Sequence, residues 1–420
     1  MKNISRKSIS RILGISIVII LLISIGVIIW YSMSRSPQEI SGTTTSRIAT
    51  TSTSIQHETL TQTQISLTNT ITTQLPRTYI PATLNGGGSS AINPQMQNWA
   101  KIFRDDISEG AITVNYQSIG SGAGQKGIVD GSLDFAGSDI PLTKDNYDAL
   151  KSKGRGFIQI PIIAISIAVI YNIPEWDQSK CGPLRLSPEA IAEIYLGNIV
   201  YWDDPLIKNL QKPECQALLP HKEIYGVHRS DGSGSTALLT MYLSKAYPKW
   251  NQTVGYGLVV NWPIDNTGRG IGGKGSEGVI AQVKNTKYSI GYVEPNYAEK
   301  ENIPIAAVTN KAGQFILPTK DAIEEALKRG ATALPKPDEY WGSVPLQFVY
   351  QDGNNTYPIV GTPIIIIRTD LPKDKLEALK QFFTWVLTNG QKETYVLPGY
   401  YPLPTELTSI AVKYLSDYLK

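Results

Sequence analysis

Residues 112–139 read ITVNYQSIGSGAGQKGIVDGSLDFAGSD and indicate the fold class. The stretch begins with a β-rich run, Ile112–Ile119, and passes directly into the loop Gly120-Ser-Gly-Ala-Gly. A second polar loop, Ala136-Gly-Ser-Asp, ends it. Strands that alternate with helical segments and end in polar loops are typical of α/β proteins. The stretch therefore predicts an α/β domain.

The same pattern continues along the chain from about Thr83. Apolar, β-branched runs predict strands over 112–119, 162–171, 224–228, 289–293 and 364–368. Apolar residues at helical spacing predict helices over 94–104, 187–196, 235–246 and 372–388. No solenoid repeat interrupts this alternation.

The N-terminus carries an uncharged apolar run, ILGISIVIILLISIGVIIWY, at residues 12–31. About 20 such residues are needed for a helix to cross a bilayer. Four basic residues precede the run: Lys2, Arg6, Lys7 and Arg11. The excess of positive charge predicts a cytoplasmic tail over 1–11, with everything downstream on the outer face. The run is therefore predicted to be a transmembrane anchor, with a cleaved signal segment as the alternative.

Residues 32–80 differ in composition from the rest of the chain. About half of the residues between Ser41 and Arg77 are Ser or Thr, with almost no aromatic residue and no sustained period. Such a segment cannot bury a core, so it predicts a solvated Ser/Thr-rich linker between the membrane and a globular head.

Charge and cysteine content narrow the class of protein. The formal net charge is +3, and no run of Lys and Arg occurs in the body of the chain, which argues against nucleic-acid binding. The two cysteines, Cys181 and Cys215, both follow the linker. On an oxidising outer face they form either a disulfide or two inert thiols.

Four polar loops combine glycine with hydroxyls or an acid near strand ends or helix starts. They are Asn85-Gly-Gly-Gly-Ser-Ser, Gly120-Ser-Gly-Ala-Gly, Ala136-Gly-Ser-Asp and Arg229-Ser-Asp-Gly-Ser-Gly-Ser. Glycine lets backbone N–H groups approach an anion closely, and hydroxyls and helix N-termini add further attraction. Any one loop alone is ordinary turn chemistry, but four in one α/β chain indicate an anion-binding site.

Nucleotide and catalytic motifs are incomplete. Gly122–Gly127 fits GxGxxG, but no acidic residue follows at the end of a second strand. Gly268–Lys274 fits GxxxxGK, but Gly275 stands where a magnesium-binding Ser or Thr is required. No GxSxG is present, and the three histidines, His57, His221 and His228, lack metal-ligand spacing. We therefore predict no catalytic residue, no metal and no cofactor.

The four loops and their surroundings resemble the phosphate-binding proteins of high-affinity phosphate ABC importers. The matching stretches are 85–139, 193–204, 228–236, 272–278 and 290–294, so the resemblance covers nearly all of the chain after residue 80. It implies a periplasmic-binding-protein fold of type II, with two lobes and a hinge between them. It places lobe I at 81–169 and 358–420 and lobe II at 170–357.

The resemblance also implies a set of phosphate contacts. They are Ser90, the backbone N–H of Ala91, Ser121, Asp139, Arg229, Ser233, Gly234 and Ser235, with Asp231 supporting the arginine. Ser90 and Ser235 stand where family members often have threonine, and Ala91 replaces a larger residue. Serine retains the donor hydroxyl, and Ala91 contributes its backbone, so these departures leave the expected contacts intact.

Asp139 is the informative member of this set. A carboxylate accepts hydrogen bonds but cannot donate them, so it suits an anion that itself carries a proton. Monohydrogen phosphate carries one, whereas sulfate at neutral pH would face Asp139 acceptor against acceptor. An Asx turn or a helix cap before Pro141 is the alternative role of Asp139.

The sequence therefore predicts an extracytoplasmic receptor that binds HPO4(2−) or H2PO4(−) between its lobes. Its expected partners are phosphate, the permease of a phosphate ABC importer and, through residues 12–31, the membrane. Two alternatives use the same site. One is an outward-facing phosphatase with Ser90, Ser121 or Ser233 as nucleophile, and the other is a phosphate sensor.

Overall fold

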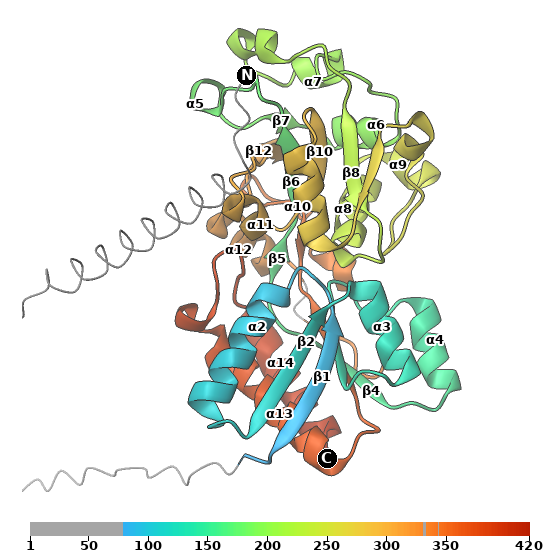
Figure 1. Cartoon of the computed structure of the whole chain (residues 1–420), viewed down its shortest axis with the longest axis vertical. Helices are drawn as coiled ribbons and strands as arrows, with labels where there is room; N and C mark the ends of the chain where they lie inside the picture. Colours follow the sequence, from blue (N-terminus) through green and yellow to red (C-terminus); the bar gives the residue numbers. More distant parts are fainter. Residues whose placement is uncertain (1–78, 331–332, 343) are drawn as a thin grey trace, which may run out of the picture. The chain divides into compact units, whose positions relative to one another are not determined.

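The two largest β-sheets organise the computed structural model, which describes residues 79–330, 333–342 and 344–420 (Figure 1). The predicted tail 1–11, the predicted anchor 12–31 and all of the linker 32–80 except its last two residues lie outside these ranges. Within the described ranges, no helix is both long and apolar enough to cross a bilayer.

The first sheet has five strands in the order β2-β1-β3-β14-β4. These are β1 (Ala82–Gly88), β2 (Ile112–Ser118), β3 (Phe135–Ser138), β4 (Phe157–Pro161) and β14 (Ile364–Arg368). Strand β1 runs parallel to β2 and β3, and β14 runs antiparallel to β3 and β4. The four consecutive isoleucines of β14 are fully buried, as expected for a strand covered on both faces.

The second sheet has four strands in the order β6-β10-β8-β9. These are β6 (Ala168–Asn172), β8 (Tyr225–Arg229), β9 (Gly270–Gly273) and β10 (Ser289–Val293). Strand β8 runs parallel to β9 and β10, and β6 runs antiparallel to β10. Each sheet belongs to one lobe of a mixed α/β, two-lobed binding-protein fold.

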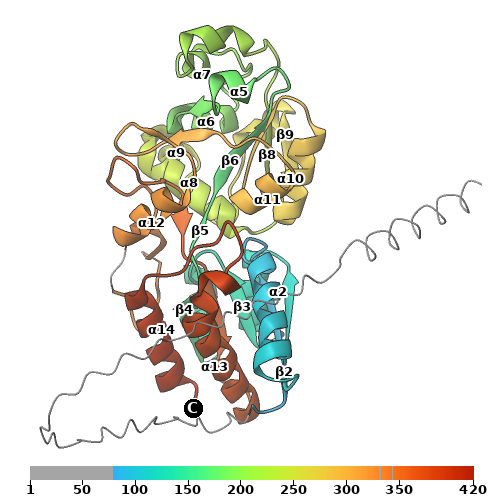
Figure 2. The ribbon, with the colours of Figure 1, turned by 90° about the vertical axis from the view of Figure 1, so that its left-hand side faces the viewer.

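A short two-stranded ladder lies where the chain passes between the sheets. Strand β5 (Ile165–Ser166) pairs antiparallel with β13 (Val360–Gly361), so the outgoing and returning segments run side by side (Figure 2). A three-stranded sheet beside the second lobe joins β7 (Arg185–Leu186), β11 (Ala307–Thr309) and β12 (Phe315–Ile316).

Helices cover both large sheets. The helices that follow or flank the first sheet are α2 (Asn93–Ile102), the π-helical η1 (Phe103–Ile107), α3 (Ser121–Asp130), α4 (Lys144–Ser152), α13 (Lys373–Thr388) and α14 (Thr405–Tyr418). Between β6 and β13 lie α5 (Gln178–Cys181), α6 (Pro188–Tyr195), α7 (Pro205–Lys208), α8 (Gly234–Ala246), α9 (Pro248–Thr253), α10 (Gly275–Asn285), α11 (Pro295–Lys300) and α12 (Lys320–Lys328). The 3-10 turns are η2 (Pro213–Leu218), η3 (Pro263–Thr267), η4 (Val344–Gln347), η5 (Asn389–Gln391) and η6 (Glu393–Tyr395).

Several sequence predictions differ from the observed elements. The predicted loop 120–124 enters α3 at Ser121, and the first three residues of the predicted loop 136–139 belong to β3. The predicted strand 162–171 is divided, because β5 pairs within the connection whereas β6 joins the second sheet. The predicted loop that begins at Asn85 is strand up to Gly88, because Asn85–Gly88 pair with residues 115–118 of β2. Only Ser89 and Ser90 of that motif follow the strand.

Aromatic clusters fill the interior of both lobes. In the first lobe, Phe103 of η1 contacts Phe382 of α13, with ring centroids 5.2 Å apart, and Phe135 of β3 contacts Phe383 of α13 at 5.1 Å. In the second lobe, Trp262 packs against Tyr195 and Tyr292 at 4.9 Å and 6.0 Å. A disulfide between Cys181 and Cys215, with Cα atoms 5.9 Å apart, joins the end of α5 to η2.

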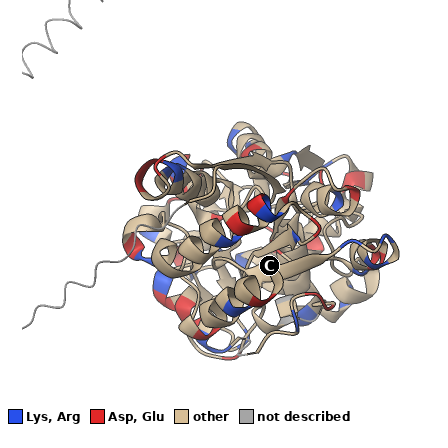
Figure 3. Cartoon of the chain, turned by 90° about the horizontal axis from the view of Figure 1, so that it is seen from below, with Lys and Arg blue, Asp and Glu red and all other residues tan. Residues whose placement is uncertain are grey.

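Positions of Lys and Arg lie among positions of Asp and Glu along the ribbon seen down the long axis, without a broad region of one sign (Figure 3). This mixture agrees with the small formal net charge of +3.

Candidate anion-binding site

The predicted site residues come together where strand ends and helix starts of the two lobes meet. Ser90 follows β1, Ser121 begins α3 and Asp139 follows β3 in the first lobe. Arg229 ends β8, and Gly234 begins α8 in the second. Parallel strands bring their carboxyl ends to one edge of a sheet, and ligands bind in that region of α/β folds.

Asp139 lies at the centre of the first lobe's contribution and is only 2% exposed. Ser89 Oγ donates to Asp139 Oδ1, and Ser121 Oγ donates weakly to Asp139 Oδ2 over 3.5 Å. The backbone N–H of Asp139 donates to Ser121 Oγ at 3.3 Å. These contacts hold the Asp139 carboxyl group between the Ser89 and Ser121 hydroxyls. An Asx turn alone would not account for them.

The environment of Asp139 disfavours its ionised form. Burial is the largest influence, and together with the negative charge of Glu294 it raises the pKa of Asp139 to about 7. The hydrogen bond from Ser89 and the positive charge of Arg229 act in the opposite direction. Both protonation states of Asp139 are therefore accessible near neutral pH.

Arg229 supplies the positive charge of the second lobe's contribution. Its Nε and Nη2 donate to the two carboxylate oxygens of Asp231 at 2.7 Å and 2.6 Å, in a bidentate pair. Its backbone N–H donates to the hydroxyl of Tyr292 at 3.0 Å, which ties the arginine to the aromatic cluster. Burial acts to lower the pKa of Arg229, but the hydrogen bond and charge of Asp231 raise it above the ordinary value.

The start of α8 is built around Ser233. Its Oγ accepts the N–H of Thr236 at 3.2 Å and caps the helix, and its own N–H donates to the carbonyl of Leu258 at 2.8 Å. Ser233 is thus committed to local structure in this arrangement. The first N–H groups of a helix have no intrahelical acceptor, so those of Gly234 and Ser235 suit an anion.

The other predicted contacts also have partners within the protein. The N–H of Ala91 donates to Ser89 Oγ at 3.1 Å. Ser90 Oγ lies 3.0 Å from Ser276 Oγ, and Ser235 Oγ donates to Glu294 Oε1 at 2.6 Å. The hydroxyls of Ser90 and Ser235 therefore bond to protein groups of the second lobe in this structure.

The lobes meet closely at the site. A β-carbon added to Gly234 would lie 2.3 Å from Asp139 Cβ, so only glycine fits there. The N–H of Gly122 in α3 donates to the carbonyl of Gly232 at 2.9 Å. These contacts bring the two halves of the predicted site together in a buried seam.

Sequence reasoning missed several residues of this seam, among them Ser89, Ser276, Glu294 and Tyr297. The Tyr297 hydroxyl donates to the Ser90 carbonyl at 2.8 Å. Ser276 and Glu294 fall within stretches that carry the family resemblance, 272–278 and 290–294. That location was the available signal, but their side-chain contacts depend on how β10, α10 and α11 pack.

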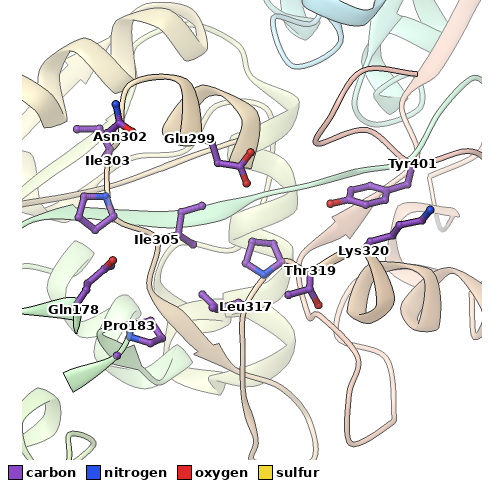
Figure 4. Close-up of a pocket in the computed structure, with 13 residues that line it drawn as sticks. Gln178, Pro183, Glu299, Asn302, Ile303, Ile305, Leu317, Thr319, Lys320 and Tyr401 are labelled. Carbon is purple, nitrogen blue, oxygen red and sulfur yellow. The ribbon is translucent and has the colours of Figure 1, made fainter. Parts of the chain in front are cut away.

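A cavity lies away from this site, beside α11 and α12. It has a volume of about 730 Å³, and its lining includes Glu299, Ile305, Lys320 and Tyr401 (Figure 4). None of the predicted phosphate contacts lines it. Lys320 within it is 2.5 Å from Glu393, so its charge is already paired.

Comparison with known proteins agrees with the fold. A family model described as a PBP superfamily domain matches residues 41–389. The phosphate-binding protein PstS of Methanocaldococcus jannaschii is 39% identical over 323 residues, which cover 76% of this chain and 82% of that protein. The phosphate-binding protein PstS of Pasteurella multocida is 37% identical, over 77% and 87% of the two chains.

A solved structure supports the same fold. The high-affinity periplasmic phosphate-binding protein PfluDING, bound with phosphate, superposes with a TM-score of 0.59 at 19% identity and covers 78% of this chain and 92% of its own. The sequence identities of the relatives and the extent of the family match together show that the chain belongs to the PstS family of phosphate-binding proteins, within the PBP superfamily.

Proposed function

We propose that the chain is an extracytoplasmic receptor that binds inorganic phosphate between its two lobes and delivers it to the permease of an ABC importer. Its relatives are named for phosphate binding, at up to 39% identity over most of both chains. The phosphate contacts would be Ser90, Ala91, Ser121, Asp139, Arg229, Ser233, Gly234 and Ser235, with Asp231 holding the arginine.

The observation that carries the proposal is the position of Asp139 in the seam. It is buried among hydroxyls and close to Gly234, whose N–H begins α8. An ionised Asp139 accepts a hydrogen bond from the P–O–H group of HPO4(2−) or H2PO4(−), while Arg229 and the helix N–H groups donate to the other oxygens. Sulfate has no proton to offer and would be rejected.

A phosphatase is the alternative on the same fold, and the contacts of its candidate residues do not favour it. A serine nucleophile needs an activating base. His228, the histidine nearest in sequence to Arg229, bonds to Asp265 at 2.8 Å and stacks on Trp262 at 5.0 Å. Ser233, one candidate nucleophile, caps α8.

The receptor would work by closure of its two lobes. Lobe I would comprise 81–169 and 358–420, and lobe II 170–357, with the β5–β13 ladder beside the hinge. Hinge closure around a ligand is the usual motion of periplasmic binding proteins. Residues 12–31 would anchor the head to the membrane, and residues 32–80 would serve as its linker.

Calorimetric titration of the full chain, stripped of bound anion, tests the proposal with phosphate first and sulfate second. We expect tight binding of phosphate and no measurable heat with sulfate at pH 8. Equal binding of the two anions would contradict the role given to Asp139. No binding of phosphate would contradict the receptor function itself.

A further inference from the structure

Glu294 is a second buried carboxylate beside the proposed phosphate site, and the phosphate contacts above do not include it. It lies at the end of β10, directly before α11, and is only 1% exposed. A buried carboxylate is costly unless hydrogen bonds compensate for its lost hydration. Its partners therefore indicate what it does.

Both carboxylate oxygens of Glu294 accept hydrogen bonds from serine hydroxyls that lie at the starts of helices. Ser235 Oγ in α8 donates to Oε1 at 2.6 Å, and Ser276 Oγ in α10 donates to Oε2 at 2.7 Å. Both donors are neutral, so the carboxylate bridges two helices without an ion pair in these two contacts. The positive ends of the two helix dipoles add further stabilisation.

The donor of each hydroxyl hydrogen bond can be assigned in turn, from Glu294 to the first lobe. Each serine hydroxyl has a single hydrogen. Ser276 gives its hydrogen to Glu294, so the 3.0 Å contact between Ser276 Oγ and Ser90 Oγ requires Ser90 to be the donor. The N–H of Ser276 donates back to Ser90 Oγ at 3.2 Å. Ser90 and Ser276 thus hold each other across the seam.

The resulting chain of hydrogen bonds runs from Ser90 to Ser276, to Glu294, and back to Ser235 at the start of α8. It connects a contact between the lobes with the helix start that would bind phosphate. Because both oxygens of Glu294 accept from serine hydroxyls, the direction of every hydroxyl bond in the chain is fixed. Ser235 would then present its backbone N–H, rather than its hydroxyl, to the anion.

We infer that Glu294 is a positioning residue that ties the closed arrangement of the lobes to the phosphate-binding start of α8 through Ser276 and Ser235. The inference rests on the proposed phosphate-binding function. Its effect should appear mainly as slow release of phosphate, because the Ser90–Ser276 contact forms only when the lobes are together.

The variant Glu294→Gln tests this role with nearly unchanged side-chain volume. An amide accepts through its oxygen but donates through its nitrogen, so it cannot receive both serine hydroxyls in their present direction. We expect phosphate to dissociate at least tenfold faster from the full-length variant, measured by stopped-flow release. Ser276→Ala, which keeps the carboxylate and removes the link to Ser90, should accelerate release to a similar extent.

The matched control is Glu277→Gln, one residue after Ser276. Glu277 Oε1 lies 3.1 Å from the Tyr297 hydroxyl but takes no part in the chain of serine bonds. Its phosphate release rate should stay within twofold of the wild-type rate. The thermal midpoints of all ligand-free variants, measured in parallel, report any general loss of folding.

A double-variant cycle shows whether Glu294 acts on phosphate release through Ser276 or stabilises the structure independently of Ser276. If Glu294 acts through Ser276, the combined Glu294→Gln and Ser276→Ala protein should release phosphate no faster than the faster single variant. Rates that multiply, a single Glu294→Gln rate within twofold of wild type, or tighter binding by that variant would overturn the inference. Failure of the wild-type chain to bind phosphate would instead contradict the proposed function.

Discussion

At the scale of single residues, Asp139 and Arg229 would place an acceptor and a donor on opposite lobes of the proposed phosphate site. Arg229 already gives two hydrogen bonds to Asp231, so its position is fixed before an anion arrives. Asp139 is held by Ser89 and Ser121. Preorganised groups lose little conformational freedom on binding, which favours affinity.

Replacement of Asp139 by asparagine should relax the discrimination between phosphate and sulfate. The asparagine amide can donate to a fully ionised oxyanion, whereas the carboxylate cannot. We expect the ratio of phosphate to sulfate affinity to fall at least tenfold, equivalent to about 1.4 kcal/mol. Competition titrations of wild type and variant at pH 8 measure this ratio, and an unchanged ratio would contradict the role of Asp139.

The selectivity of the wild-type chain should also depend on pH. The pKa of Asp139 is raised to about 7, mainly by burial, so the ionised form prevails above that pH and the protonated form below it. A protonated Asp139 can donate to sulfate. Sulfate should therefore bind more tightly at pH 6 than at pH 8, and the Asp139→Asn variant should show no such change. Pairwise calorimetry at the two pH values gives the result.

At the scale of elements, the start of α8 meets Asp139 where only glycine fits. Alanine at position 234 would ordinarily favour the helix by up to about 1 kcal/mol. Its methyl group, however, would lie 2.3 Å from Asp139 Cβ across the seam. We expect Gly234→Ala to preserve the thermal midpoint of the ligand-free chain and to weaken phosphate binding at least 100-fold. A variant with normal affinity would show that the lobes do not approach this closely when phosphate binds.

The disulfide ties together the short elements α5 and η2 in the second lobe. The cysteines are 34 residues apart, and closing a loop of that length stabilises the fold by roughly 4 kcal/mol in the chain-entropy model. We expect the Cys181→Ser and Cys215→Ser double variant to lose several kcal/mol of unfolding free energy in urea while keeping its phosphate affinity. Loss of affinity without loss of stability would contradict a purely structural role.

The sequence was most informative where an element is strongly apolar. Strands 289–293 and 364–368 have the predicted bounds, because β10 and β14 are central and their buried runs end at polar residues. The sequence predicts a loop from Asn85, because the glycines of this segment lack β propensity. The segment is a strand in the structure because it pairs with β2.

In the proposed site too, some residues could be predicted from the local sequence, whereas others are identified only by how the elements pack. Hydroxyls and charges in glycine-rich loops marked Asp139, Arg229 and the start of α8 from sequence alone. Glu294 follows an ordinary apolar strand, and its importance comes from the serines of two other helices that reach it. The resemblance of residues 290–294 pointed to this region, but one glutamate after a strand does not indicate a role, so only the packed structure identifies the contacts of Glu294.

At the scale of the whole molecule, phosphate should hold the two lobes together. The direct contacts across the seam include Gly122 with Gly232, Ser90 with Ser276, and Tyr297 with Ser90. Charge-assisted bonds from both lobes to one anion would outweigh these neutral contacts. We expect small-angle X-ray scattering to show a smaller radius of gyration with phosphate than without it. Gly234→Ala should show no such decrease, and an identical radius in wild type would contradict closure.

The position of β14 has a consequence for folding during synthesis on the ribosome. This strand lies between β3 and β4 in the first sheet, yet it is made just over 200 residues after β4. Before residues 364–368 emerge, β4 has no neighbour in that sheet, whereas all four strands of the second sheet have already been synthesised. Vectorial synthesis would thus allow the later-encoded lobe to mature first, while the earlier-encoded lobe waits for about the last seventh of the chain.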